Sequence, residues 1–458
     1  MTAGVIQADP HASDFPPSFT WGVSTAAYQI EGAAREGGRG PSIWDVFSHT
    51  PGKVARGDTG DVACDHYHRW REDLELLREL GVGAYRFSVA WPRWQPSGRG
   101  AINPAGRDFY ERLVDGLLDI GVEPWLCLYH WDLPQALQDQ GGWATRDAVG
   151  WFGDYAASVL GVLGDRVEHV AVLNEPNVVG LLGHLLGVHA PGLTDLTAYA
   201  AATHHLNLAT GDTLARLRAE HPGLRLGTIL NLQPVLAESD DEPDAAAAAL
   251  LDAVWNGNHL EPLVSGRYPA VSEAILAPVV EEGDARRIRQ PLDWFGLNLY
   301  SQLRVAADPA SLVGLRLVDP PEEVETTAMG WEVAPEALSR QLVEAAARLG
   351  DVPIVVTENG AAYRDRPGPD LEVDDALRTR YLERHVREVQ AARERGVDVR
   401  GYFVWSLLDN FEWHEGFAKR FGLVYVDYAS QQRSPKRSFR WYRELIRSGR
   451  IPASDEVR

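Results

Sequence analysis

Cysteine is scarce in this sequence, which contains only Cys64 and Cys127 among its 458 residues. The two lie far apart, form no Cys-x-x-Cys pair and belong to no spacing that is typical of a zinc site. A disulfide framework and a zinc-stabilised fold are therefore excluded, and we expect two buried free thiols.

The sequence also lacks a surplus of positive charge and any long hydrophobic run. Its formal net charge of −21 argues against nucleic acid or an anionic membrane as a partner. No run approaches the roughly 18 apolar residues of a membrane helix, and residues 1–10 have neither the basic start nor the apolar centre of a secretion signal. We expect a cytoplasmic protein that acts on a neutral small molecule.

No Pro/Ser-rich linker, tandem repeat or break in composition divides the chain. We therefore expect one catalytic domain over residues 15–448, with a short N-terminal tail at 1–14 and a C-terminal tail at 449–458. Apolar residues make up 45% of the sequence, which is enough for a large core.

Apolar, β-branched runs alternate with segments of helical period along the whole domain. The expected strands are 19–27, 84–90, 123–129, 170–176, 224–231, 294–300, 352–358 and 399–406. The expected helices are 65–80 (with Gly81 as its stop), 104–120, 146–163, 198–220, 245–259, 335–349, 374–395 and 439–446, and 301–331 reads as irregular. Because parallel strands need crossover helices, this alternation predicts an α/β fold, a (β/α)₈ TIM barrel with long βα loops. The alternative, an open doubly wound sheet, usually has a glycine-rich turn directly after its first strand. The glycine-rich stretch Gly37–Gly40 does not follow an expected strand, which argues against this fold.

Two of the expected strands end in a glutamate. The run before Glu358 closes in Thr-Glu-Asn-Gly, and the run before Glu175 closes in Leu-Asn-Glu-Pro. One such residue would be read as a turn or helix cap. Two carboxyl groups delivered to the catalytic rim of a barrel supply the acid and the nucleophile or base of glycoside hydrolysis.

Most of the other strands also end in a polar or aromatic residue. Taken singly, each has a structural explanation as a core or ion-paired residue, but repeated burial of polar groups is costly. Sugars present hydroxyls at the ring edge and C–H groups on the ring faces, which suit planar polar groups and aromatic rings. The candidate binding residues are Gln29, Arg86, His130, Trp131, Asn174, Asn298, Tyr300, Trp405, Glu412 and Trp413.

Several segments resemble the family 1 glycoside hydrolases, the β-glucosidase family, in the order of that family, from about Phe15 to Ile446. They are Phe19–Gly22, Tyr28–Gly32, Tyr85–Ser88, Leu128–Pro134, Gly142-Trp143, Asn174–Pro176, His189–Gly192, Thr357–Gly360 and Asp409–Trp413. The resemblance implies that Glu175 is the acid/base and Glu358 the nucleophile. It further implies a sugar subsite of Gln29, His130, Asn174, Trp405, Glu412 and Trp413, contacts from Arg86 and Tyr300 to the nucleophile, and Trp331 at the aglycone entrance.

The sequence departs from the family pattern at three positions. Asn177 stands where a tryptophan is usual, His184 where a tyrosine is common and Leu299 where an aromatic residue is frequent. We expect Asn177 and His184 to face the leaving group and to affect its selection.

These patterns together predict a retaining, exo-acting β-glycosidase, a β-glucosidase, with no metal or cofactor and a small-molecule β-glucoside as its partner. A sugar-binding pseudoenzyme would lack one of the two carboxylates, and both are present. A 6-phospho-β-glycosidase needs a cationic pocket, which Glu412 opposes, although Lys419-Arg420 lies nearby. Transglycosylation uses the same intermediate and stays open, and oligomeric state and aglycone are not predicted.

Overall fold

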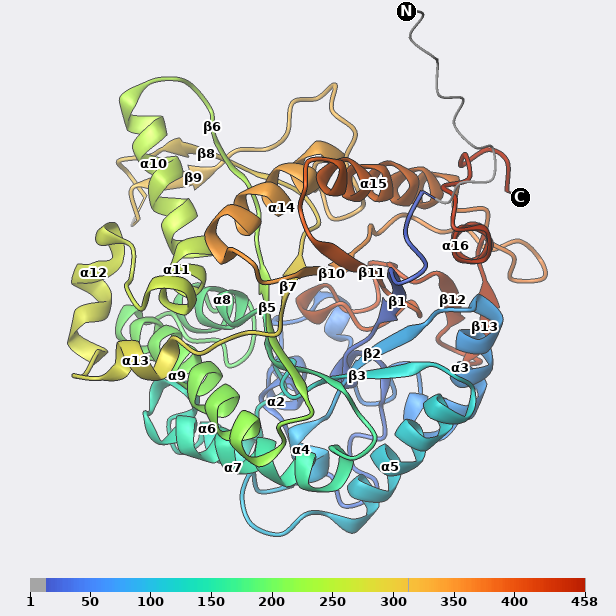
Figure 1. The fold of residues 1–458 in the computed structure, drawn as a ribbon, viewed down its shortest axis with the longest axis horizontal. Coiled ribbons are helices and arrows are strands. Elements are labelled where there is room, and N and C mark those ends of the chain that lie inside the picture. Colours follow the sequence, from blue (N-terminus) through green and yellow to red (C-terminus); the bar gives the residue numbers. More distant parts are fainter. Residues whose placement is uncertain (1–13, 312, 458) are drawn as a thin grey trace, which may run out of the picture.

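The computed structural model describes residues 14–311 and 313–457, and their centre is a closed barrel of parallel strands (Figure 1). The strand order is β1-β11-β10-β7-β5-β4-β3-β2. This confirms the predicted (β/α)₈ barrel. The strands are β1 (Thr20–Ser24), β2 (Ala84–Ser88), β3 (Glu123–Cys127), β4 (His169–Asn174), β5 (Arg225–Asn231), β7 (Trp294–Asn298), β10 (Ile354–Asn359) and β11 (Val399–Trp405).

Helices surround the barrel in the order that the sequence predicts (Figure 1). Gly81 ends the first of them in the left-handed region, at a φ of 77°, as expected of a glycine stop. They are α3 (His66–Leu80), α5 (Pro104–Asp119), α7 (Asp147–Leu163), α9 (Leu196–Glu220), α10 (Glu242–Asp252), α11 (Asn258–Ser265), α14 (Pro335–Leu349), α15 (Ala376–Glu394) and α16 (Arg437–Ser448).

The prediction of one continuous helix over 245–259 is wrong. A π-helical segment, η4 (Ala253–Gly257), separates α10 from α11. Its Asn256 side chain donates to the carbonyl of Gln233, and its Trp255 indole donates to the carbonyl of Asn231. These bonds to the loop after β5 are long-range, so helical period cannot reveal them.

The prediction that 301–331 is irregular is wrong in part. β8 (Leu303–Ala307) and β9 (Leu315–Leu317) join β6 (Val235–Ala237) in a small sheet over α10 (Figure 1). A second unpredicted pair, β12 (Val424–Asp427) and β13 (Gln432–Pro435), forms an antiparallel hairpin. β6, β8 and β9 are partly exposed, and β12 is buried but only four residues long, so none of them shows the longer buried apolar run that marks a barrel strand.

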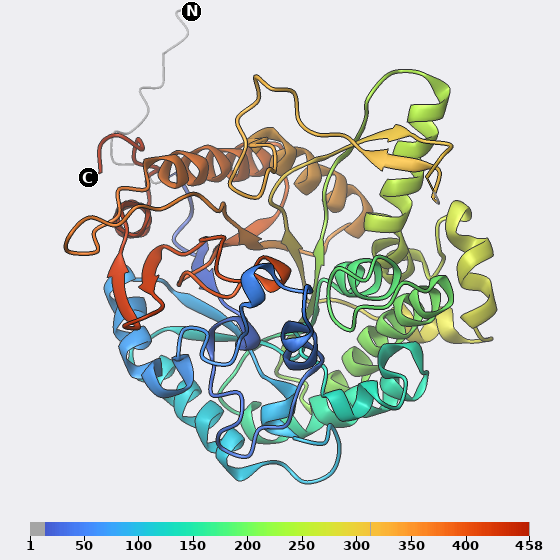
Figure 2. The same cartoon turned by 180° about the vertical axis from the view of Figure 1, so that it is seen from behind.

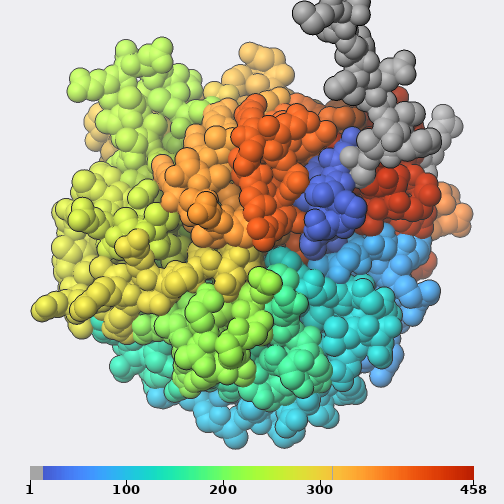
Figure 3. Space-filling model, viewed as in Figure 1, coloured from blue at the N-terminus to red at the C-terminus, as the bar shows by residue number. Residues whose placement is uncertain are grey.

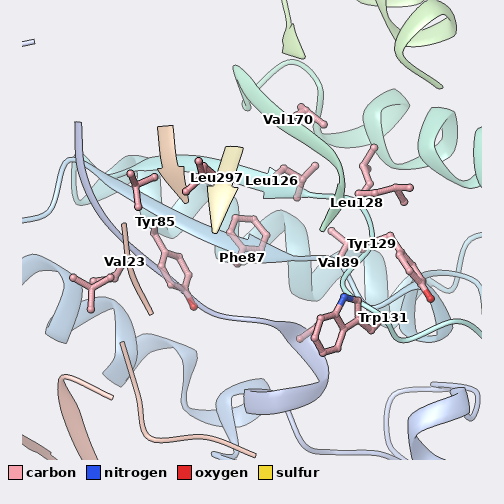
Figure 4. Packing of buried hydrophobic residues seen from close by; sticks show 14 of the residues in the cluster. Val23, Tyr85, Phe87, Val89, Leu126, Leu128, Tyr129, Trp131, Val170 and Leu297 are labelled. Atoms are coloured by element: carbon pink, nitrogen blue, oxygen red, sulfur yellow. The ribbon is translucent and has the colours of Figure 1, made fainter. Parts of the chain in front are cut away.

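The barrel strands send alternate side chains into two separate cores. One cluster gathers inside the barrel and contains Ala84, Trp125, Cys127, Ala171, Ile229, Trp294, Val355 and Phe403. The other lies between barrel and helices, and Figure 4 shows members from neighbouring strands, among them Tyr85, Phe87, Leu126 and Val170. Both cysteines are buried and free, as expected.

The two ends of the barrel differ. In Figure 3 the chain leading into β1, in blue, packs between the orange-red C-terminal helices and the blue-cyan segments around β2 and β3. From behind, Figure 2 shows the opposite end, where the long loops that follow the strands gather. The residues expected as a C-terminal tail pack on this framework, because the amide of Ile451 donates to Asp14 and the Trp441 indole donates to the carbonyl of Pro452.

Candidate active site

Glu175 and Glu358 line one cavity at the carboxyl ends of the barrel strands. Both side chains are almost fully buried, at 4% and 3% exposure. Glu358 lies on β10, and Glu175 follows β4 directly and starts α8 (Pro176–Gly180) with a positive φ of 49°. The fold therefore brings together two carboxyl groups that are 183 residues apart in sequence, as the positions 175 and 358 show.

A pairing irregularity precedes each glutamate. In β10 the register with β7 shifts between Val356 and Glu358. In β4 the register with β5 shifts between Ala171 and Asn174, and Val172 and Leu173 both pack in the outer core. Such bulges re-aim the side chains that follow them. Strict alternation would place Glu358 on the same side as Val356, and the bulge turns it to the cavity instead.

Glu358 accepts a hydrogen bond at each carboxylate oxygen. Arg86 Nη1 donates to Oε1 at 2.5 Å, and the Tyr300 hydroxyl donates to Oε2 at 2.5 Å. Burial and the charge of Glu358 raise the pKa of Tyr300 well above its ordinary value, so this residue stays a donor. A guanidinium and a hydroxyl on opposite oxygens stabilise Glu358 as a carboxylate.

The surroundings of Glu175 favour the opposite protonation state. Burial, followed by the negative charge of Glu358, raises the pKa of Glu175 to about 8. Hydrogen bonds from Asn298 and Asn231 and the charge of Arg86 oppose this rise without cancelling it. At neutral pH Glu175 is therefore mostly protonated.

The other predicted site residues fall into two groups. His130, Trp131, Tyr300, Trp331, Trp405, Glu412 and Trp413 line the same cavity. Gln29, Arg86, Asn174 and Asn298 stand behind this lining and hydrogen-bond to it or to one another, for example Arg86 Nη2 to Asn174 Oδ1 at 2.6 Å.

Aromatic rings and unpaired polar atoms occur together in this site. The His130 ring stacks near Trp405 and Trp413, with centroids 5.8 and 5.9 Å apart. His130 Nδ1 and Gln29 Oε1 are buried without a hydrogen-bond partner in the described part of the chain. Unpaired buried polar atoms are costly, and hydroxyl groups of a ligand would satisfy them.

Glu412 is the third carboxyl group in this cavity. Burial, and then the charges of Glu358 and Glu175, raise its pKa to about 8, so it is mostly protonated at neutral pH. The nearby cations have other partners. Lys419 donates to the carbonyl of Ala328 at 2.6 Å, and Arg420 pairs with Asp409 at 2.7 Å.

The prediction that Asn177 and His184 face the leaving group is wrong. The Asn177 amide donates to the carbonyls of Asn231 and Trp255, and the His184 ring bonds to the carbonyl of Val179. Burial lowers the pKa of His184 to about 4. Because the chain after Glu175 is helical, positions three and seven residues later share its face, and Val178 and Leu182 line the cavity instead.

Sequence reasoning missed further lining residues, which are Val178, Leu182, His189, Asn231, Gln233, Trp255, Met329, His414 and Phe421. Asn231 and Gln233 carried a usable signal, because they are polar residues at the end of the fifth strand. Trp255 carried none, since only the π-helical turn directs it to the cavity.

Within residues 14–311 and 313–457, no group of three or more histidine, cysteine, aspartate or glutamate side chains is placed to hold a metal ion. Over the same residues, no helix is both long enough and apolar enough to cross a membrane.

The chain is similar to known proteins over nearly its whole length. Residues 11–450 match glycosyl hydrolase family 1. β-Glucosidase A of Thermotoga maritima is 43% identical over 438 residues, covering 95% of this chain and 98% of that protein. Thermostable β-glucosidase B of Thermobispora bispora is 47% identical over 465 residues, covering 98% and 95%. A solved structure of β-glucosidase from Thermotoga maritima in complex with deoxynojirimycin superposes with a TM-score of 0.92 at 42% identity, covering 96% of this chain and 100% of that one. On this match, which spans nearly the whole chain, the protein belongs to glycosyl hydrolase family 1.

Proposed function

We propose that this chain is a retaining, exo-acting β-glucosidase, which releases terminal β-D-glucosyl residues from disaccharides, short oligosaccharides or aryl glucosides. The observation that carries the proposal is the pair of buried carboxyl groups in one cavity, where Arg86 and Tyr300 each donate a hydrogen bond to Glu358 and where the pKa of Glu175 is raised. The names of the relatives, which are β-glucosidases, point to the same substrate class.

In the first step Glu358 attacks the anomeric carbon while Glu175 donates its proton to the departing oxygen. The glycosidic C–O bond breaks, and a covalent bond forms between the sugar and Glu358. Arg86 and Tyr300 suit this role because each donates a hydrogen bond to one oxygen of Glu358 and so orients the carboxyl group before attack.

In the second step Glu175 takes a proton from water, which attacks the same carbon and releases Glu358. Glycosylation has removed the charge of Glu358 by then, so one of the two causes that raise the pKa of Glu175 is gone. The residue that acted as acid can then act as base. Two inversions at one carbon give overall retention.

We assign substrate binding to residues around these carboxyl groups. Gln29, His130, Asn174, Trp405, Glu412 and Trp413 would hold the glucosyl unit, with Trp131, Asn298 and Tyr300 beside it and Trp331 toward the aglycone. Gln29 supports an exo mode, because its amide donates to Asn410 Oδ1 at 3.0 Å and to the carbonyl of Phe411 at 2.8 Å. These bonds tie the loop that carries Glu412 and Trp413, two residues of the cavity lining, to the segment after β1.

The alternative substrate is a 6-phosphoglucoside. Lys419 and Arg420, the cations that follow Glu412 in the sequence, have partners already, and Arg86 is paired with Glu358. Three carboxyl groups line the cavity. Initial rates on aryl β-glucosides with and without a 6-phosphate test the proposal. We expect the unphosphorylated substrate to be preferred, and a preference for the phosphorylated one would replace β-glucosidase by the alternative.

A further inference from the structure

One oxygen of Glu175 receives two amide hydrogen bonds. Asn298 Nδ2 lies 2.7 Å and Asn231 Nδ2 lies 3.0 Å from Glu175 Oε1. An asparagine amide can be turned over without changing its shape, so each of these bonds needs a neighbour that fixes which end is the donor.

The indole of Trp255 fixes the orientation of Asn231. Its Nε1–H can only donate, and it lies 3.2 Å from Asn231 Oδ1 and 3.1 Å from the Asn231 carbonyl. The Gln233 amide also donates to Asn231 Oδ1, at 2.9 Å. Because Oδ1 faces these donors, the Nδ2 group of Asn231 must face Glu175.

Arg86 fixes the orientation of Asn298 in the same way. Its guanidinium can only donate and lies 2.6 Å from Asn174 Oδ1. The amide end of Asn298 that meets this oxygen, at 3.1 Å, must therefore be Nδ2, and the same nitrogen meets Glu175. The Thr357 hydroxyl donates to the other end of that amide, at 2.6 Å.

We propose that Trp255 and Asn231 form a positioning relay that places the proton of Glu175 on Oε2, the oxygen left for the leaving group. An oxygen that already accepts two N–H bonds has little room for a proton of its own. The relay rests on the proposed function, since it acts through Glu175 as the acid. Asn231, Gln233 and Trp255 are cavity residues to which the family resemblance assigned no role.

The relay also affects the proton affinity of Glu175. Besides burial, the groups that act on this carboxyl include Glu358 on β10, Arg86 on β2, Asn298 on β7 and Asn231 on β5. The Glu412 carboxyl lines the same cavity and also interacts with Glu175. The Asn231 bond lowers the pKa, against burial and against the charge of Glu358. Its loss should raise the pKa of Glu175 and free the proton to occupy either oxygen.

The test compares Asn231→Ala and Trp255→Phe with wild type on aryl β-glucosides of graded leaving-group ability. Trp255→Phe keeps a six-membered aromatic ring and removes the five-membered ring of the indole together with its N–H. General acid catalysis contributes about 10²–10⁴-fold, so we expect about a 10-fold or larger loss of kcat/KM on poor leaving groups for Asn231→Ala. A 2,4-dinitrophenyl leaving group needs no proton, and its rate should change by less than about 3-fold. Trp255→Phe should show the same pattern with a smaller loss.

The second readout is the basic limb of the kcat/KM profile, which should move to higher pH in Asn231→Ala. Val254→Ala, a change in the same π-helical turn, serves as the control and should move neither readout. If Asn231→Ala lowers kcat/KM equally for all leaving groups and leaves the basic limb unmoved, Asn231 has only a structural role. That result would overturn the proposed relay but not the proposed function. A wild type that cleaves no aryl β-glucoside would overturn the proposed function and the relay together.

Discussion

Glu175 and Glu358 have the same side chain, and their neighbours give them different chemistry. Glu358 has a donor on each oxygen, one of them a guanidinium, whereas Glu175 has two amides on a single oxygen. The sequence could predict both glutamates because each ends a β-branched run. It could not predict Asn231 as a partner, because that contact depends on the loop after β5 and on the π-helical turn.

The pH dependence of the first step follows from the pKa of Glu175. The acid must be protonated, so kcat/KM should be highest at pH values below the raised pKa of Glu175. It should fall as the pH rises through about 8. A kcat/KM profile on an aryl β-glucoside with a poor leaving group measures this limb. A fall in kcat/KM that is centred near the ordinary glutamate pKa of roughly 4.3 would contradict the assignment of Glu175 as the acid.

Replacement of Glu358 by glutamine separates the two causes of the raised pKa. Glu358→Gln removes the negative charge, so the pKa of Glu175 should fall, and it should stay above its ordinary range because burial remains. NMR titration of isotope-labelled carboxyl groups measures it directly. An unchanged or higher pKa would mean that burial alone holds the proton.

Replacement of Glu412 tests whether this residue binds hydroxyl groups of the sugar. Removing one partner of a buried hydrogen bond costs about 1–3 kcal/mol, so Glu412→Ala should lower kcat/KM on glucosides by about 5- to 150-fold. The loss should be smaller on a 6-deoxy substrate, which lacks one of the hydroxyls that Glu412 would contact. A variant with wild-type kcat/KM on both substrates would remove Glu412 from the binding site.

At the scale of elements, the connection from β11 to β12 depends on a buried ion cluster. Asp409, which begins the Asp-Asn-Phe-Glu-Trp stretch, accepts from Lys436 Nζ at 2.7 Å and pairs with Arg420. Lys436 Nζ also donates to Asp365 at 2.5 Å and is fully buried. Sequence reasoning identified this stretch by its motif, but the cluster joins residues from distant segments and leaves no local pattern.

Removal of the central cation should destabilise this cluster. Breaking a buried ion pair costs about 3–5 kcal/mol, so Lys436→Met should lower the free energy of unfolding by an amount of that order. Urea unfolding measures it. Lys419→Met is the matched control, because the ion pair of Lys419 with Glu415, at 3.7 Å, is partly exposed. Together with the lost hydrogen bond to the Ala328 carbonyl, this change should cost only about 1–2 kcal/mol. Equal effects of the two changes would contradict a structural role specific to Lys436.

At the scale of the whole molecule, the barrel could be predicted from the sequence, whereas the additional short strands and the bulges could not. Long β-branched runs alternating with helical period leave a strong signal, because each barrel strand is buried on both faces. β8 and β9 are short and partly exposed, so the same criterion fails for them. The bulges before Glu175 and Glu358 could not be predicted from the sequence either, because they depend on the pairing with neighbouring strands.

The stereochemistry of the product tests the central claim most directly. Two displacements at one carbon, the first by Glu358, make the β-anomer of the sugar the first product. NMR spectra of a fresh reaction, recorded before mutarotation equilibrates the anomers, identify it. We predict that β-glucose accumulates first. Initial formation of α-glucose would require a single displacement by water and would contradict the role of Glu358 as nucleophile.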